Sequence, residues 1–303
     1  SLRSLSSLSS HPAKTIYDSD GTAIPAAHIN GYLMDAPDVW IESRAKPLCD
    51  VPEMKSGGKP VEGGHLMFTA QEKEEFLRVE PMAAKYFRRI TGSEEYINGI
   101  DRWCLWLDGV SPSAIRSMPH VMERVRRVRD MRLSSVKAAT RKAAEAPWQF
   151  MEIKQPDSDF ILVPKVSSEK REYVPMGFFS PEVICSDLVF MVPSATLYHF
   201  GVLTSRVHMA WMRAVAGRLK SDYRYSGAIV YNNFPWPNLC DSASLREKIS
   251  QTAQAILDAR ARHPDSSLAD LYDPLTMPPD LRAAHEANDR AVLAAYGLRS
   301  DTP

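Results

Sequence analysis

The sequence predicts an α+β protein in which a mixed-sheet domain with flanking helices is followed by a small C-terminal helical segment. Two observations predict this class. Up to Pro237, short apolar runs typical of strands alternate with stretches of helical periodicity. After Asp241 the chain changes character, and apolar residues recur at helical spacing. The prolines around Trp236 mark the boundary between the two parts.

On this basis the 303 residues divide into three parts. Residues 1–28 are polar and turn-rich, which predicts a linker or disordered extension. Residues 29–238 are expected to form the mixed-sheet domain, and residues 241–299 the helical domain. The N-terminus lacks the continuous apolar core of a signal peptide, and the chain lacks an initiator Met, so we expect a fragment excised from a larger protein.

The composition is ordinary for a globular protein, with 44% hydrophobic residues, 24% charged residues and no net charge. The four cysteines are scattered, without the Cys-x-x-Cys spacing of a zinc site, so we expect reduced thiols in a cytoplasmic protein. No apolar run is long enough to span a membrane, so no membrane association is expected.

The first elements of the mixed-sheet domain are predicted from capping patterns and alternation. Thr69 and Glu72 resemble a capping box at the start of a charged helix that runs to Val79. Apolar and polar residues alternate through Arg102–Leu107, which we expect to pair as a strand with Glu95–Gly99. Ser111 followed by Pro112 is typical of a helix start.

A strongly basic region follows, from Arg116 to Lys142, opposed only by Glu123 and Asp130. We expect helices from about Met118 to Ala146. The spacing of three and four residues places four side chains on one face of an amphipathic helix: Val121, Val125, Val128 and Arg132. The C-terminal tail leans acidic, so charge is unevenly distributed in a neutral protein, as expected for a nucleic-acid-binding face. An ordinary solvated surface helix is the alternative.

The remaining elements are predicted from apolar runs. The expected strands are Gln149–Ile153, Phe160–Val163, Tyr173–Phe178 and Val183–Val192. The expected helices are Thr196–Leu203, Arg206–Leu219, Ser244–Arg262, Leu268–Tyr272 and Pro279–Tyr296.

The segment Ile161–Tyr173 carries the most suggestive chemistry. It predicts a hairpin whose tip holds Ser, Glu, Lys and Arg. Arg and Lys side chains donate hydrogen bonds to guanine, and Glu accepts from the amino group of cytosine. A solvated turn without function is the alternative for this segment taken alone.

Catalytic motifs are scarce. The sequence contains neither a glycine-rich nucleotide-binding loop nor a Gly-x-Ser-x-Gly nucleophile motif. Asp38, Glu53 and Lys55 fit the Pro-Asp…Glu-x-Lys pattern of Mg²⁺-dependent nucleases, which needs carboxylates for the metal and a lysine near the attacking water. The pattern is short and precedes a glycine pair rather than lying in an apolar strand, so a nuclease is kept as an alternative only. A non-catalytic protein-interaction module is a further alternative.

Several segments together resemble one family. They are Ile29–Cys49, Gly92–Gly99, Arg102–Leu107, Arg132–Ser135, Pro164–Glu169 and Leu219–Pro237. In this order, and over roughly residues 15–297, the chain resembles the C-terminal part of bacterial MmeI-like Type IIL (IIG) restriction–modification enzymes.

The resemblance implies a target recognition domain that binds double-stranded DNA, followed by a helical tail that packs on this domain or on the methyltransferase. It implies no catalytic or metal-binding residues in this chain. The nuclease and N6-adenine methyltransferase domains, with their S-adenosyl-L-methionine and Mg²⁺, would lie upstream in the same polypeptide. The family's base-reading positions fall in the segment that matches Ser167–Tyr173. Glu169 and Arg171 are the first expected base readers, and Lys170 and Tyr173 are the next. Lys137, on the basic helix, is expected to reach a neighbouring base. The expected phosphate contacts are Arg124, Arg127, Arg132, Arg141 and Lys142.

Overall fold

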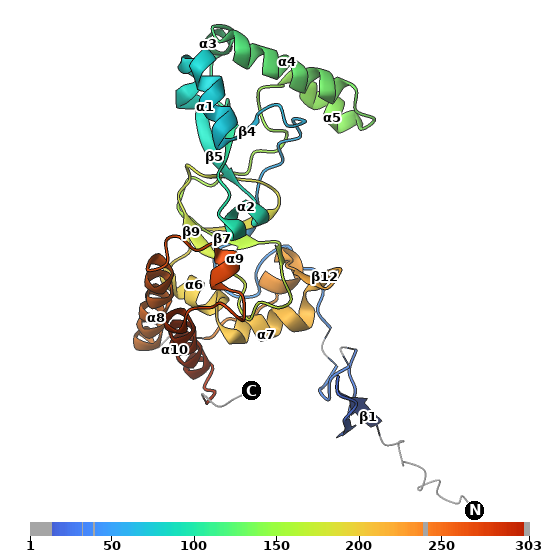
Figure 1. Ribbon diagram of the computed structural model, residues 1–303. Coiled ribbons are helices and arrows are strands. Elements are labelled where there is room, and N and C mark those ends of the chain that lie inside the picture. The colour runs from blue at the N-terminus through green and yellow to red at the C-terminus, as the bar shows by residue number, and fades with distance from the viewer. Residues whose placement is uncertain (1–13, 32, 39, 239–241, 300–303) are drawn as a thin grey trace, which may run out of the picture. The chain divides into compact units, whose positions relative to one another are not determined.

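The computed structural model describes residues 14–31, 33–38, 40–238 and 242–299 (Figure 1). The chain divides into two compact units, the first ending at Ser43 and the second beginning at Arg44. Cys49, Cys104 and Cys185 are free thiols, as expected. Residues 1–13 of the expected linker, and the fourth cysteine Cys240, lie outside the described residues.

The first unit contains an antiparallel hairpin of β1 (Lys14–Tyr17) and β2 (Ala23–Ala26). Gly21 lies in the turn between them with φ of 83°, a conformation that glycine adopts without strain. The description of residues 1–28 as a linker therefore missed two strands. Both strands are short and mostly exposed, so they lack the apolar alternation that marks a strand in a sequence.

The first sheet of the second unit is mixed, as expected. Its order is β10 (Ile184–Cys185), β5 (Phe87–Thr91), β6 (Arg102–Leu105) and β4 (Met67–Thr69), with β10 parallel to β5 and the other pairs antiparallel. Helix α1 (Ala70–Val79) follows β4, and the 3-10 helix η1 (Pro81–Tyr86) precedes β5. The predicted capping box is confirmed: Thr69 Oγ1 accepts from Glu72 N at 3.2 Å, and the Glu72 carboxylate accepts from Thr69 N at 2.7 Å.

The expected strand at Glu95–Gly99 is wrong, because this stretch belongs to helix α2 (Ser93–Asn98). The Glu95 carboxylate accepts a 3.0 Å hydrogen bond from Gly92 N at the start of the helix. Gly99 ends the helix in the left-handed conformation with φ of 66°. These capping contacts stabilise a short helix where the apolar residues alone suggest a strand.

Helices α3 (Pro112–Arg116), α4 (Pro119–Leu133) and α5 (Ala138–Lys142), with the 3-10 turn η2 (Ala143–Glu145), form the predicted basic helical region. The prediction that four residues share one face of α4 is confirmed, and the structure buries all of them, Arg132 included: Val121, Val125, Val128 and Arg132. The three valines pack against side chains of the first sheet, including Phe68 and Leu105, in one hydrophobic cluster.

A second sheet has the order β3 (Lys55–Ser56), β11 (Val189–Pro193), β7 (Phe160–Pro164) and β9 (Gly177–Phe179), and all its pairs are antiparallel. A third sheet has the order β12 (Gly217–Leu219), β13 (Asp222–Arg224) and β8 (Val166–Ser167). The expected strand at Gln149–Ile153 is reduced to an isolated bridge between Glu152 and Lys59.

The predicted hairpin around Ile161–Tyr173 is only partly right. The chain does return antiparallel to β7, with Ile161 opposite Phe178, but the returning strand begins at Gly177 rather than at Tyr173. The intervening β8 pairs with β13, where Ser167 lies opposite Tyr223. Because β8 pairs with a strand 56 positions later in the chain, the connection between β7 and β9 is more than a simple turn.

The remaining helices are α6 (Leu197–Leu203), α7 (Arg206–Val215), α8 (Ala243–Ala261), α9 (Leu268–Leu271) and α10 (Pro279–Ala295), with a π turn at Gly227–Tyr231. Each helix lies where the sequence predicts it, except that α7 ends at Val215 because β12 begins at Gly217. Helices α8 and α10 pack side by side (Figure 1), and α6 also packs on α8, where a side chain at Gly201 would meet Ile249 Cγ2 at 2.6 Å. Among the described residues, no helix has the length and apolar character that crossing a membrane requires.

Candidate nucleic-acid interface

The polar segment of interest is the connection between β7 and β9, residues 165–176, which we call the 165–176 connection. A turn at Ser168 shapes its tip: Ser168 O accepts from Arg171 N at 3.2 Å, and Ser168 Oγ accepts from Lys170 N at 3.3 Å. Glu169 and Lys170 are exposed at this turn. Both side chains are therefore free of the core and available to a ligand.

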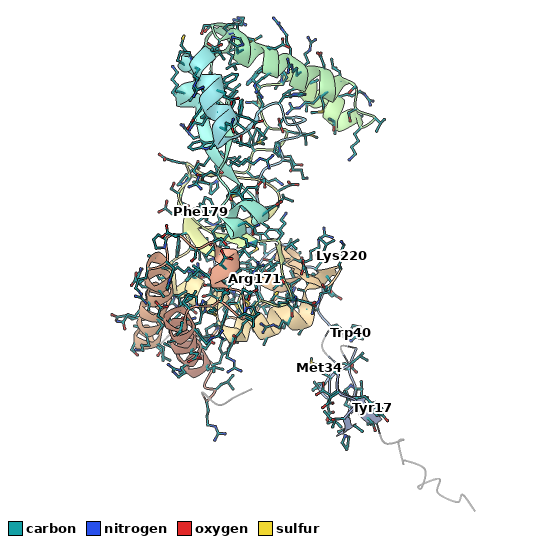
Figure 2. The ribbon with its side chains drawn as sticks, viewed as in Figure 1. Tyr17, Met34, Trp40, Arg171, Phe179 and Lys220 are labelled. Carbon is teal, nitrogen blue, oxygen red and sulfur yellow. The ribbon has the colours of Figure 1, made fainter. Side chains whose placement is uncertain are left out.

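Arg171 is half-buried in the second unit (Figure 2). Burial lowers the pKa of its guanidinium, while the charges of Asp222 and Asp273 oppose that shift. Its Nε atom has no hydrogen-bond partner among the described residues. A buried Nε–H group that has lost water without gaining a partner is suited to donate to an incoming acceptor.

An open groove lies beside Arg171. It has a volume of about 330 Å³, and its lining includes Ser167, Asp222 and, from α2, Glu94 and Asn98. Neither Asn98 nor Asp222 is among the site residues predicted from the sequence. No local signal could have found them, because they reach the groove from segments far from Arg171 along the chain.

Tyr173 cannot read a base in this structure, so that assignment is wrong. Its side chain is 3% exposed, and its hydroxyl donates a 2.7 Å hydrogen bond to Asp289 Oδ2. Its ring stacks on His285 with 4.1 Å between ring centroids. Burial, followed by the neighbouring Asp289 charge, raises the pKa of the Tyr173 hydroxyl.

A second candidate surface lies on α4 and α5. Six basic side chains are exposed there, and we call them the basic surface: Arg126, Arg127, Arg129, Lys137, Arg141 and Lys142. Arg127 pairs with Glu123 at 3.1 Å, and Arg141 donates to the carbonyl oxygens of Ser135 and Val136 at 2.8 Å. These pairs are exposed and contribute little stability, so the cations can exchange them for phosphates.

Arg132 is not part of this surface, and its assignment as a phosphate contact is wrong. Its side chain is 1% exposed, and its guanidinium donates to five backbone carbonyl oxygens. These belong to Pro60, Val61, Ala143, Ala146 and Gln149. All three nitrogen atoms of the Arg132 guanidinium are thus hydrogen-bonded inside the protein.

Arg124 also has a structural role. Its guanidinium lies 4.0 Å from the centroid of the Phe68 ring and donates to His65 O at 2.8 Å. The half-buried position lowers the pKa of Arg124 through desolvation, with Glu72 opposing the shift. We therefore assign Arg124 to the packing of α4 rather than to phosphate contacts.

The residues of the nuclease alternative are divided between the two units. Asp38 belongs to the first unit and pairs with His28 at 3.1 Å, whereas Glu53 and Lys55 belong to the second. Lys55 lies in β3 opposite Met191. Within the described parts of the chain, no group of three or more His, Cys, Asp or Glu residues could hold a metal ion. The nuclease alternative is not favoured.

Small sheets that carry a polar connection and a pair of basic helices, followed by packed helices, are the arrangement expected of a DNA recognition module. The family model described as "MmeI, target recognition domain" matches residues 35–238, and the one described as "MmeI, C-terminal domain" matches residues 242–302. The chain belongs to the MmeI family, as the resemblance implied.

Two similar proteins agree with this membership. The Type IIL restriction-modification enzyme MmeI, solved in complex with DNA, is 44% identical with a TM-score of 0.89, and the match covers 97% of this chain and 39% of that chain. DNA methyltransferase A of Bacillus subtilis (strain 168) is 40% identical over 277 residues, which are 91% of this chain and 31% of that protein. The type IIG restriction endonuclease BpuSI is a distant likeness, 14% identical with a TM-score of 0.42, over 81% of this chain and 30% of that one. The chain thus spans less than two fifths of the length of MmeI and of DNA methyltransferase A.

Proposed function

We propose that this chain recognises a specific DNA sequence on behalf of a longer restriction–modification polypeptide. One observation carries the proposal: nearly the whole chain is similar, at 44% identity, to MmeI, which was solved in complex with DNA. The match of residues 35–238 to a target recognition domain supports the same function.

Two groups of side chains would contact the DNA in different ways. Glu169, Lys170 and Arg171, with Lys137 behind them, read base edges, because their donors and acceptors match those of the major groove. Arg127, Arg141 and Lys142 hold phosphates, which fixes the register on the duplex without specifying its sequence. The exposure of the first group's tip and of the basic surface supports this division.

The reaction itself belongs to domains outside this chain. We infer that an upstream domain of the same polypeptide methylates adenine at N6 with S-adenosyl-L-methionine, and that a nuclease domain cleaves with Mg²⁺. The 31% and 39% coverage of the relatives leaves room for both domains. The partners of this chain are then double-stranded DNA and the methyltransferase domain, and a cytoplasmic location follows from them.

The test is to map methylated adenines on genomic DNA by single-molecule sequencing, using the full-length polypeptide. The wild type should modify one sequence motif, and Arg171→Ala should make that motif degenerate at one position. Arg78→Ala is the matched control, because Arg78 is exposed on α1 and lies outside both candidate surfaces. An unmodified genome would reject the proposed function, and a uniform loss of methylation in Arg171→Ala would reject base reading by that residue.

A further inference from the structure

Tyr173 connects the 165–176 connection to the C-terminal helix α10. Its hydroxyl donates to Asp289 Oδ2 at 2.7 Å, and its ring stacks on His285 one turn earlier on the same helix. Both contacts are buried, with Tyr173 3% and Asp289 5% exposed. A buried hydrogen bond to a carboxylate combined with a ring stack fixes both the position and the rotation of the tyrosine.

The partners of Tyr173 are themselves held in place. Asp289 Oδ1 accepts a 2.7 Å hydrogen bond from Arg206 N at the start of α7. His285 Nε2 lies 2.8 Å from the hydroxyl of Tyr272, just after α9. Tyr173 therefore packs into a site built from three helices, and it cannot shift without disturbing them.

Further contacts hold the residues on either side of Tyr173. Glu172 Oε2 pairs with Arg282 of α10 at 3.3 Å, and the Glu172 carbonyl accepts from Arg213 of α7. Val174 N donates to Met209 Sδ at 3.3 Å, and the Met176 carbonyl accepts from Arg260 of α8. The second half of the connection is thus bound to three helices, while Glu169 and Lys170 remain exposed.

We propose that Tyr173 is a positioning residue: through Asp289 and His285, helix α10 sets the placement of Arg171 and Glu169 and thereby the base discrimination, without contacting DNA. This inference rests on the proposed function. Tyr173 lies two residues after Arg171, so a displaced tyrosine displaces the guanidinium. Hydrogen bonds to base edges need donor–acceptor distances of about 2.7–3.2 Å, so a shift of about 1 Å breaks them.

The experiment compares Tyr173→Phe with Tyr296→Phe in the full-length polypeptide. Each substitution removes one hydroxyl from a tyrosine, and each hydroxyl donates a 2.7 Å hydrogen bond. Tyr296 donates to Pro235 O, so its variant alters the junction with the C-terminal helices but not the 165–176 connection. Phenylalanine keeps the ring, so both variants are expected to fold.

The first readout is the map of methylated adenines. Tyr173→Phe should raise methylation of sites that differ from the motif at one base pair by about fivefold or more relative to the motif itself, the lower limit for losing one bidentate base contact. Tyr296→Phe should leave the motif unchanged. A Tyr173→Phe motif identical to that of the wild type, or a uniform loss without new sites, overturns the positioning role.

The second readout is amide hydrogen exchange of residues 165–176 without DNA. Tyr173→Phe should speed exchange in this stretch, and Tyr296→Phe should not. Equal exchange rates in Tyr173→Phe and the wild type would overturn the anchoring of the 165–176 connection, whatever the map of methylated adenines shows. An unmodified genome in the wild type, by contrast, overturns the proposed function and the claim about discrimination, while faster exchange in the variant would still support the anchor.

Discussion

The Nη2 atom of Arg132 donates a 2.7 Å hydrogen bond to the carbonyl oxygen of Gln149. The remaining N–H groups of the same guanidinium donate to the carbonyl oxygens of Pro60 and Val61, which lie before α4 in the chain. They also donate to those of Ala143 and Ala146, which lie after it. A fully buried cation is costly unless its donors are all satisfied. Here the carbonyls belong to turns and loops, and those of Pro60, Ala143 and Ala146 also accept a backbone N–H, so the arginine joins α4 to two loops that are themselves hydrogen-bonded.

Replacement of Arg132 tests this role. Arg132→Met should lower the free energy of unfolding by about 3 kcal/mol or more, because five carbonyl oxygens lose the hydrogen bond from the guanidinium at once. Urea denaturation of both proteins measures the change. Arg129→Met, an exposed position one turn earlier on α4, should shift stability by no more than about 0.5 kcal/mol. If Arg132→Met were equally mild, the buried guanidinium would not stabilise the fold.

A salt titration tests the basic surface. Arg127→Ala should weaken binding to all duplexes and reduce the slope of log K against log[salt] by about 0.9, the value for one phosphate contact. Fluorescence anisotropy from 50 to 300 mM salt gives this slope. The control is Arg89→Ala. Arg89 lies in β5 of the first sheet, and like Arg127 it is an exposed arginine in an ion pair, 2.7 Å from Asp101. Equal slopes for the two variants would remove Arg127 from the phosphate contacts.

Buried histidines predict that stability falls in mild acid. Burial lowers the pKa of His199 to about 4 and that of His208 to about 3, and it holds the pKa of His285 well below its usual value. The unfolded chain takes up these protons near pH 6.5 and the folded protein does not, so the stability present above pH 6.5 is lost as the pH falls toward 4. Burial of Asp289 raises the pKa of its carboxyl, which acts in the opposite sense.

The measurement is the urea midpoint between pH 7 and pH 5 for wild type and His208→Gln. Each histidine removes up to about 1.4 kcal/mol per pH unit below its unfolded pKa. The wild-type midpoint should therefore decline with falling pH, and the decline should be smaller in His208→Gln. A wild-type midpoint that stays constant over this range would contradict the prediction.

The glycine pair after β3 is a packing requirement. A Cβ at Gly57 would lie 2.1 Å from the carbonyl oxygen of Ser186, and this oxygen belongs to the backbone and cannot move aside. Gly57→Ala should therefore destabilise the protein by about 1–3 kcal/mol, as overpacking does. Gly217→Ala is the control, since the nearest atom to its Cβ would be 3.9 Å away. Thermal unfolding of both variants measures the difference, and equal melting temperatures would contradict the close approach.

The sequence by itself determined the local structure of much of this protein. Helical spacing identified the buried face of α4, and the pattern from Thr69 to Glu72 identified the start of α1. The three C-terminal helices were predicted within two residues at each end. These features depend on contacts between residues a few positions apart, and such contacts repeat with the period of the helix.

Only the tertiary structure decided which polar residues belong to the interior. Tyr173 lies among exposed polar neighbours, and nothing local separates it from Arg171. Helical spacing places Arg132 on the valine face of α4, but it does not identify the carbonyls that allow a guanidinium to be buried there. Their burial depends on Asp289, 116 positions away, and on Pro60, 72 positions away. A buried polar group must find a partner, and the partner can come from any part of the chain that the fold brings near. The sequence therefore revealed the chemistry available for recognition, while the fold decided which of those side chains can meet a ligand.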